Sequence, residues 1–119
     1  MDTNILINNG VDINHGLELL GDMEMYNETL EDFLLEQETR ILKIAECFHH
    51  RDMANYAVLV HAMKSDSKYL GFMVLADLSY QHEMASKENN VDFVSAGFPS
   101  LMEEADRITN VVKQYLGRM

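Results

Sequence analysis

The fold is decided first by the stretch from Asp22 to Phe48, DMEMYNETLEDFLLEQETRILKIAECF. Its mostly apolar stripe recurs at alternating steps of three and four residues, which is the pattern of one face of an α-helix. The stripe consists of Tyr26, Leu30, Phe33, Gln37, Ile41, Ile44 and Phe48. Asp22 suits the N-terminal end of such a helix as a capping residue, and Arg51 suits the negative C-terminal end of its dipole. The stretch therefore predicts one long amphipathic helix.

Three later stretches predict further helices of the same kind. They run from about Asp52 to Gly71, from about Phe72 to Lys87, and from Val94 to Tyr115. The last keeps the alternation of three and four throughout, and Pro99 inside it predicts a kink or a fresh start. Four long helices joined by short turns must pack as antiparallel neighbours. We therefore expect an all-α fold, an up-down antiparallel four-helix bundle.

The N-terminal part of the chain is expected to add little to this bundle. Residues 11–20 carry apolar positions that predict a short extra helix after Asp12, covering one end of the bundle. Residues 1–10 are expected to be flexible. One domain is therefore expected over residues 11–119.

Composition and charge argue against several classes of protein. The 119 residues include 20 acidic and nine basic side chains, and a net charge of −11 disfavours nucleic acid and anionic membranes as partners. No apolar run has the length of a membrane span. Cys47 is the single cysteine, so an intrachain disulfide and a thiolate-based zinc site are excluded. We expect an acidic, cytoplasmic monomer.

His61 departs from the packing pattern of its helix. The apolar stripe there centres near Leu59 and Met63, and at about 100° per residue His61 projects almost opposite, into solvent. Lys64 and Lys68 follow at three and seven residues' spacing. A neutral imidazole is a nucleophile, and ammonium groups so placed can neutralise a phosphoryl group on the ring. Histidines beside lysines also occur on plain solvated faces, so the spacing alone leaves that interpretation open.

The stretch from His61 to Gly71, HAMKSDSKYLG, resembles the signature of histidine phosphotransfer (HPt) domains. That signature has a histidine, a lysine three residues on, a small residue at four and a glycine at ten. Ser65 stands where glycine is commonest in the family, and serine is still small enough to leave the imidazole reachable. The lead-in GLELLGD, residues 16–22, fits as well. The resemblance covers about residues 11 to 116 and implies a four-helix bundle with its histidine exposed on the second bundle helix.

The resemblance also implies roles for individual residues. His61 would be the phosphoacceptor through its Nε2, and Lys64 would screen phosphoryl charge. Lys68 lies on the same face as a second lysine, at a position where many relatives carry a small residue. Glu83 would bond the imidazole Nδ1–H, because relatives carry Glu or Gln at this distance after the histidine. From packing alone, a carboxylate at the edge of a helix–helix interface needs a partner, and Lys87 at i+4 is the alternative. Lys87 is either a further positive group at the site or an ordinary solvated lysine.

The function implied by the resemblance is that of a phosphocarrier rather than an autonomous enzyme. His61 would exchange a phosphoryl group with aspartates of receiver domains, in response regulators or hybrid histidine kinases. The chain has no glycine-rich phosphate loop, so it cannot form phosphohistidine from ATP by itself. No cofactor is expected, and any magnesium would belong to the receiver. Docking is expected on apolar surface at Ala54, Ala57 and Val58.

Two other functions compete with this interpretation. One is a non-catalytic helical protein–protein interaction module that kept the fold and lost the chemistry. The other is a metal or haem bundle, which needs inward-facing Glu and His ligands that only Glu83 approaches. Cys47, His49 and His50 do not converge, because adjacent helical residues point about 100° apart. No metal site is expected, and His82 is expected at the edge of the bundle.

Overall fold

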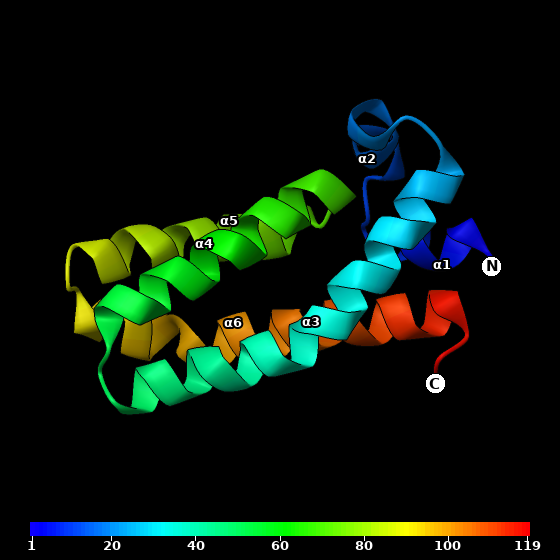
Figure 1. The fold of residues 1–119 in the computed structure, drawn as a ribbon. Helices are drawn as coiled ribbons and strands as arrows, with labels where there is room; N and C mark the ends of the chain where they lie inside the picture. The colour runs from blue at the N-terminus through cyan, green and yellow to red at the C-terminus, as the bar shows by residue number, and fades with distance from the viewer.

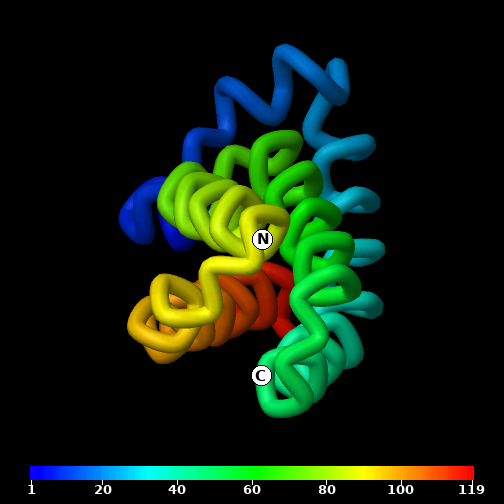
Figure 2. The backbone as a smooth tube through the Cα atoms, turned by 90° about the vertical axis from the view of Figure 1, so that its left-hand side faces the viewer, coloured from blue at the N-terminus to red at the C-terminus, as the bar shows by residue number.

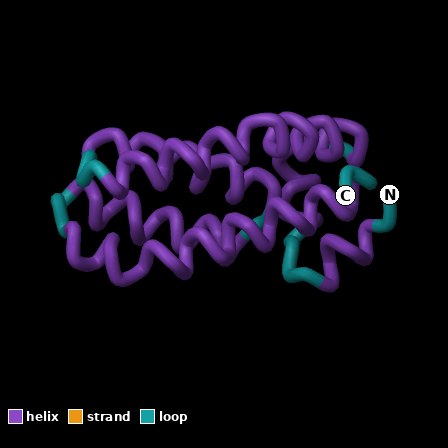
Figure 3. The backbone as a smooth tube through the Cα atoms, turned by 90° about the horizontal axis from the view of Figure 1, so that it is seen from below, coloured by secondary structure: helices purple, strands orange, loops and turns teal.

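Six helices and no strand make up the computed structural model, which describes all 119 residues (Figure 1). The helices are α1 (Thr3–Asn8), α2 (Ile13–Leu20), α3 (Met23–His49), α4 (Met53–Leu70), α5 (Met73–Lys87) and α6 (Val91–Leu116). The predicted all-α class is confirmed, and short loops join the helices (Figure 3). None of the six combines the length and the apolar character that crossing a membrane requires.

Side-chain caps fix where most of these helices begin. Asp12 accepts a hydrogen bond from the backbone N–H of His15 at 3.1 Å, and Asp22 accepts one from Met25 at 2.9 Å. Asp52 and Asn90 cap α4 and α6 in the same way. Each carboxylate or amide oxygen satisfies an N–H that the first helical turn leaves without a partner. The predicted starts after Asp12 and Asp22 are confirmed.

The N-terminal residues differ from the prediction of a flexible stretch. Residues 3–8 form α1, whose Leu6 is fully buried and which packs against α6. Arg107 of α6 also donates a hydrogen bond to the backbone carbonyl of Asn9 at 3.0 Å. The sequence did not predict this helix because six residues are too few to show a periodic stripe.

The C-terminal helix also differs from its prediction in one respect. α6 runs unbroken from Val91 to Leu116 through Pro99, so the fresh start expected there is absent. Proline removes one backbone donor and leaves the carbonyl four residues earlier unpaired. Pro99 is exposed and stands apart from the buried residues of α6, and the helix continues past it.

The four long helices enclose the core. α3 packs against α4, α4 against α5, α5 against α6, and α6 against α3, and Figure 2 shows them around a common interior. The fully buried side chains come from every one of them; examples are Tyr26, Leu30, Tyr56, Met63, Leu75, Val94 and Leu101. α1 and α2 lie at one end of the molecule, where α1 packs against α6 and α2 packs against α3 and α4 (Figure 1).

The end of α4 is fixed by a close backbone contact with the start of α2. Gly71 closes α4 in the left-handed conformation with φ of +86°, and its carbonyl accepts a hydrogen bond from the N–H of Asp12 at 2.9 Å. A Cβ at this position would lie 2.1 Å from the Asp12 carbonyl oxygen. Only glycine allows both the φ angle and the approach. The glycine ten residues after His61 therefore has a structural role, anchoring the helix that carries the histidine.

Candidate functional site

His61 lies on the outer surface of α4. The buried stripe of this helix passes through Tyr56, Val60 and Met63, and His61 stands on another side with 56% of its side chain exposed. The predicted exposure of the ring is therefore confirmed. Burial of the opposite face and the anchored end at Gly71 hold α4 in place, so the position of the ring is set by the core rather than by a loop.

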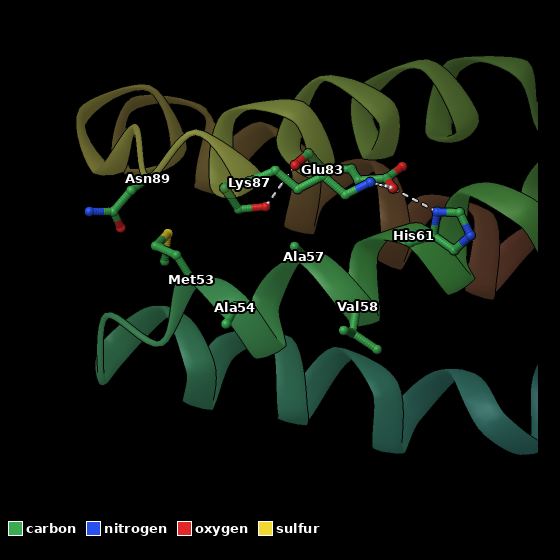
Figure 4. A pocket seen from close by; sticks show the side chains of 9 residues that line it. Met53, Ala54, Ala57, Val58, His61, Glu83, Lys87 and Asn89 are labelled. Carbon is green, nitrogen blue, oxygen red and sulfur yellow. Dashed lines mark hydrogen bonds and ion pairs between the residues drawn. The ribbon is translucent and has the colours of Figure 1, made fainter.

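Glu83 of α5 is the group that contacts this ring. Its side chain is only 2% exposed, and its Oε2 lies 2.6 Å from His61 Nδ1. Its Oε1 accepts a hydrogen bond from Lys64 Nζ at 2.6 Å, and Lys87 Nζ lies 2.8 Å from Oε2. Glu83 therefore contacts both His61 and Lys87, the two partners that the sequence left as alternatives (Figure 4).

Ion pairing decides the charge of Glu83. Burial alone raises the pKa of this carboxyl, but the hydrogen bonds from Lys64, Lys87 and His61 outweigh burial and lower the pKa to about 2. The carboxylate is therefore ionised at neutral pH and can only accept hydrogen bonds. Because it only accepts, His61 Nδ1 must carry the proton that joins the two groups.

That proton fixes the chemistry of the other ring nitrogen. In a neutral imidazole with Nδ1 protonated, Nε2 keeps its lone pair. Figure 4 shows this second nitrogen on the side of the ring away from Glu83. His61 thus presents an exposed nucleophilic nitrogen, with its tautomer held by a buried carboxylate.

The remaining predicted site residues fall into two groups. Lys64 is brought into the cluster, and its ammonium group also lies 5.5 Å from the centre of the Tyr80 ring. Lys68 is exposed and forms no ion pair, so the structure leaves it outside the cluster. Ser65 is half-buried and forms no hydrogen bond with Glu83. Lys87, for which the sequence left two readings, belongs to the cluster.

A hollow of about 670 Å³ lies between α4 and α5, next to the ring. Its apolar floor consists of Met53, Ala54, Ala57 and Val58, and His61 and Lys87 stand on its border (Figure 4). Of the three residues predicted for docking, Ala54 and Val58 are exposed. Ala57 is buried, because it faces α5, and it contributes only to the floor.

Sequence reasoning missed two exposed apolar residues of α5 beside this site. Tyr80 and Met84 are 46% and 40% exposed, and they stand three residues before and one residue after Glu83. Exposed apolar side chains that gather in one patch mark contact surfaces in many proteins. Their mutual spacing of four residues, which places both on one face of α5, was the signal that could have found them.

His82 does not lie at the edge, as the sequence predicted, but in the core. It is 2% exposed, and its Nδ1 shares a hydrogen bond of 2.7 Å with the hydroxyl of Tyr56. Burial lowers the pKa of His82, which favours the neutral ring. The edge prediction was wrong because the small residue Gly97 of α6 leaves room for the ring: a Cβ there would lie 2.9 Å from Nε2.

No group of three or more His, Cys, Asp or Glu side chains converges in a way that could hold a metal ion. Comparisons with protein-family models, with curated proteins and with solved structures gave no match to this chain. What supports a function is therefore the geometry of the residues themselves, above all the contact between His61 and Glu83.

Proposed function

We propose that this chain is a phosphocarrier of the histidine phosphotransfer class, with His61 as the residue that carries the phosphoryl group. The observation that supports this most is the exposed imidazole whose Nδ1 is held by the buried, ionised Glu83 at 2.6 Å while Nε2 stays free. In this proposal α3 to α6 form the up-down antiparallel bundle of the class, and α4, which carries His61, is its second helix.

The chemistry follows from the tautomer. The lone pair of Nε2 attacks the phosphorus of an aspartyl phosphate on a receiver domain, and the Nε2–P bond forms as the P–O bond to the aspartate breaks. The electron pair of that bond leaves with the aspartate carboxylate. No proton has to move, because Nε2 carries none and Nδ1 keeps its own. The ring gains positive charge, which Glu83 stabilises.

The lysines complete the proposed site. Lys64 holds Glu83 Oε1 and places positive charge one helical turn from the ring, where it screens the phosphoryl oxygens without transferring a proton. Lys68 has no ion-pair partner and adds positive charge a further turn along α4. Ser65 leaves the approach to Nε2 open through its small size.

The proposed partners are receiver domains of response regulators or hybrid histidine kinases. A receiver would contact the apolar surface of Val58, Tyr80 and Met84, with the charged groups of the site beside it. The chain acts as a carrier, and any magnesium that the transfer needs belongs to the partner. A monomer in the cytoplasm is the state that this role calls for.

A second candidate is a helical interaction module without phosphotransfer chemistry. The observation that favours it is the same apolar surface, because Val58 is 66% exposed and borders a hollow that suits a partner side chain. This candidate needs no reactive imidazole, so labelling of His61 separates the two.

The experiment is to incubate the protein with phosphoramidate or a phosphorylated receiver and to assay acid-labile phosphohistidine. His61→Gln is expected to abolish labelling while changing the free energy of unfolding by less than about 0.5 kcal/mol, since the ring is exposed. His50→Gln, at another exposed histidine, is the matched control and should label normally. Labelling that survives in His61→Gln contradicts the proposal, and a wild-type protein that takes no label favours the interaction module.

A further inference from the structure

The two oxygens of Glu83 have different partners. Oε1 has one cation, Lys64 at 2.6 Å, whereas Oε2 is shared by His61 Nδ1 at 2.6 Å and Lys87 Nζ at 2.8 Å. Because Lys87 pairs with the same oxygen, its positive charge weakens the electrostatic attraction between Oε2 and the imidazole. The ring and this lysine therefore share one oxygen.

The two lysines also differ in their freedom. Lys64 reaches Glu83 from α4 with 14% of its side chain exposed, and it lies over the Tyr80 ring. Lys87 comes from α5 itself, one turn after Glu83, and 57% of its side chain is exposed. Figure 4 shows Lys87 on the Nδ1 side of the histidine, with Nε2 on the far side of the ring. Lys87 is thus placed to act on the proton of the ring rather than on a group bound to Nε2.

No other charged group takes part in this shared contact. The ion pairs of Glu83 come from α4 and α5 alone, through His61, Lys64 and Lys87. The Tyr80 ring contacts Lys64, with its centre 5.5 Å from the ammonium group, but forms no hydrogen bond with Glu83. α5 also packs against α6, but α6 sends no charged side chain to Glu83, and neither does α3.

We infer that Lys87 is a positioning residue that sets how strongly the His61 ring holds a second proton, by competing with the ring for Glu83 Oε2. While Lys87 occupies Oε2, the carboxylate favours the cationic ring less, and more of the ring stays neutral and nucleophilic. When the ring gains positive charge by accepting a phosphoryl group, Nδ1–H draws more strongly on Oε2, and the exposed Lys87 can leave. This role rests on the proposed phosphotransfer, but its effect on the ring exists without it.

The test is an NMR titration of the His61 ring in the unphosphorylated full-length protein. Lys87→Met removes the charge and keeps the length of the side chain, so the ring should take its second proton at a pH about 0.5 higher, the size expected for one nearby charge in a water-like medium. Lys113→Met, the same charge change on α6, where the ammonium group pairs with Glu38 of α3, should shift the titration by about 0.1 or less, because salt screens distant charges.

A double variant separates competition from a plain charge effect. In a Glu83→Gln background the shared oxygen has lost its charge, so Lys87→Met should shift the titration by less than half as much as in the native chain. An equal shift in both backgrounds overturns the competition, as does no shift or a downward shift in Lys87→Met alone. All variants are checked for an unchanged melting transition.

Transfer measurements supply the second readout. In Lys87→Met the acidic limb of the pH–rate profile should move to higher pH by the same amount as the titration, while the plateau rate stays within about twofold. A lowered plateau with an unmoved limb contradicts the inference. If the wild-type protein takes no phosphoryl group, the proposed function fails, but the titration still decides the role of Lys87.

Discussion

Consecutive residues of α5 form the two hydrogen bonds that join a histidine ring to another side chain, and the two bonds are of opposite kinds. Glu83 forms an ion-paired hydrogen bond with the exposed ring of His61, whereas His82 is itself buried and forms a hydrogen bond with the hydroxyl of Tyr56. Both contacts join α5 to α4. The comparison shows that surroundings and not residue type decide what a histidine does: a charged partner at the surface prepares a reactive ring, and a neutral partner in the core joins two helices.

The largest expected effect is on stability, where replacing His82 and replacing His61 should have very different consequences. His82→Ala removes a buried ring and leaves the Tyr56 hydroxyl without its partner, so it should lower the free energy of unfolding by about 2–4 kcal/mol. His61→Ala should cost less than about 0.5 kcal/mol, because Lys64 and Lys87 still pair with Glu83. Urea unfolding of the two variants measures the difference. Equal losses would show that His61, too, is a structural residue.

The next effect concerns transfer rather than folding. Lys64→Ala removes the less exposed of the two lysines on Glu83 and the charge nearest the ring on α4, and it should slow phosphotransfer by roughly 10- to 100-fold, about 1.4 to 2.7 kcal/mol. His82→Phe, which changes the core contact alone, should leave the rate of the folded protein within about threefold. Rapid-quench transfer from a phosphorylated receiver gives both numbers. An unchanged rate in Lys64→Ala would make this lysine a surface residue only.

The contrast between Glu83 and His82 also shows where sequence reasoning stops. The long helices were predictable because their stripes repeat over many turns, and His61 could be placed outside the stripe of its helix by angle alone. On α5 the stripe runs through the small residues Ala76 and Ser79 and then reaches both His82 and Glu83, so the pattern does not say which side chain faces inward. The structure buries both.

Two further features depended on contacts that no spacing encodes. The burial of His82 requires the space that Gly97 leaves on α6, 15 residues later in the sequence. The sharing of Oε2 between His61 and Lys87 requires side-chain positions from two helices at once. The resemblance supplied the pairing of His61 with Glu83, and periodicity alone would not have done so.

His82 and Glu83 contribute to stability in different pH ranges, so the pH dependence of the free energy of unfolding distinguishes them. Burial holds the pKa of His82 below its usual value of 6.5, so the stability it contributes is present above that pH and is lost as the pH falls below it. Ion pairing lowers the pKa of Glu83 from 4.5 to about 2, so its contribution persists to about pH 4.5 and is lost below.

Unfolding free energies measured from pH 8 to pH 3 in three proteins separate the two ranges. His82→Phe should flatten the profile below pH 6.5 and keep the loss below pH 4.5. Glu83→Gln should do the reverse. A wild-type profile that stays level from pH 8 to pH 4.5 would contradict the assignment of the first range to a buried, neutral His82.

The smallest effect is a change in one ring titration, and it tests the contact that carries the proposed function. Glutamine at position 83 can still accept the Nδ1–H bond of His61 but no longer offers a negative charge, and it leaves Lys64 and Lys87 unpaired nearby. In Glu83→Gln the ring should therefore take its second proton at a pH about 0.5 to 1 lower than in the native chain, with Nδ1 still protonated in the neutral form. Glu83→Ala loses the acceptor as well, so its neutral ring should mix both tautomers and transfer should slow more than in the glutamine variant.

The ring of His82 is the internal control, because its contacts are with Tyr56 and Gly97 and its signals should stay unchanged. If His61 titrates alike in all three proteins, with mixed tautomers in each, Glu83 does not hold the ring in solution and the contrast between the two histidines disappears.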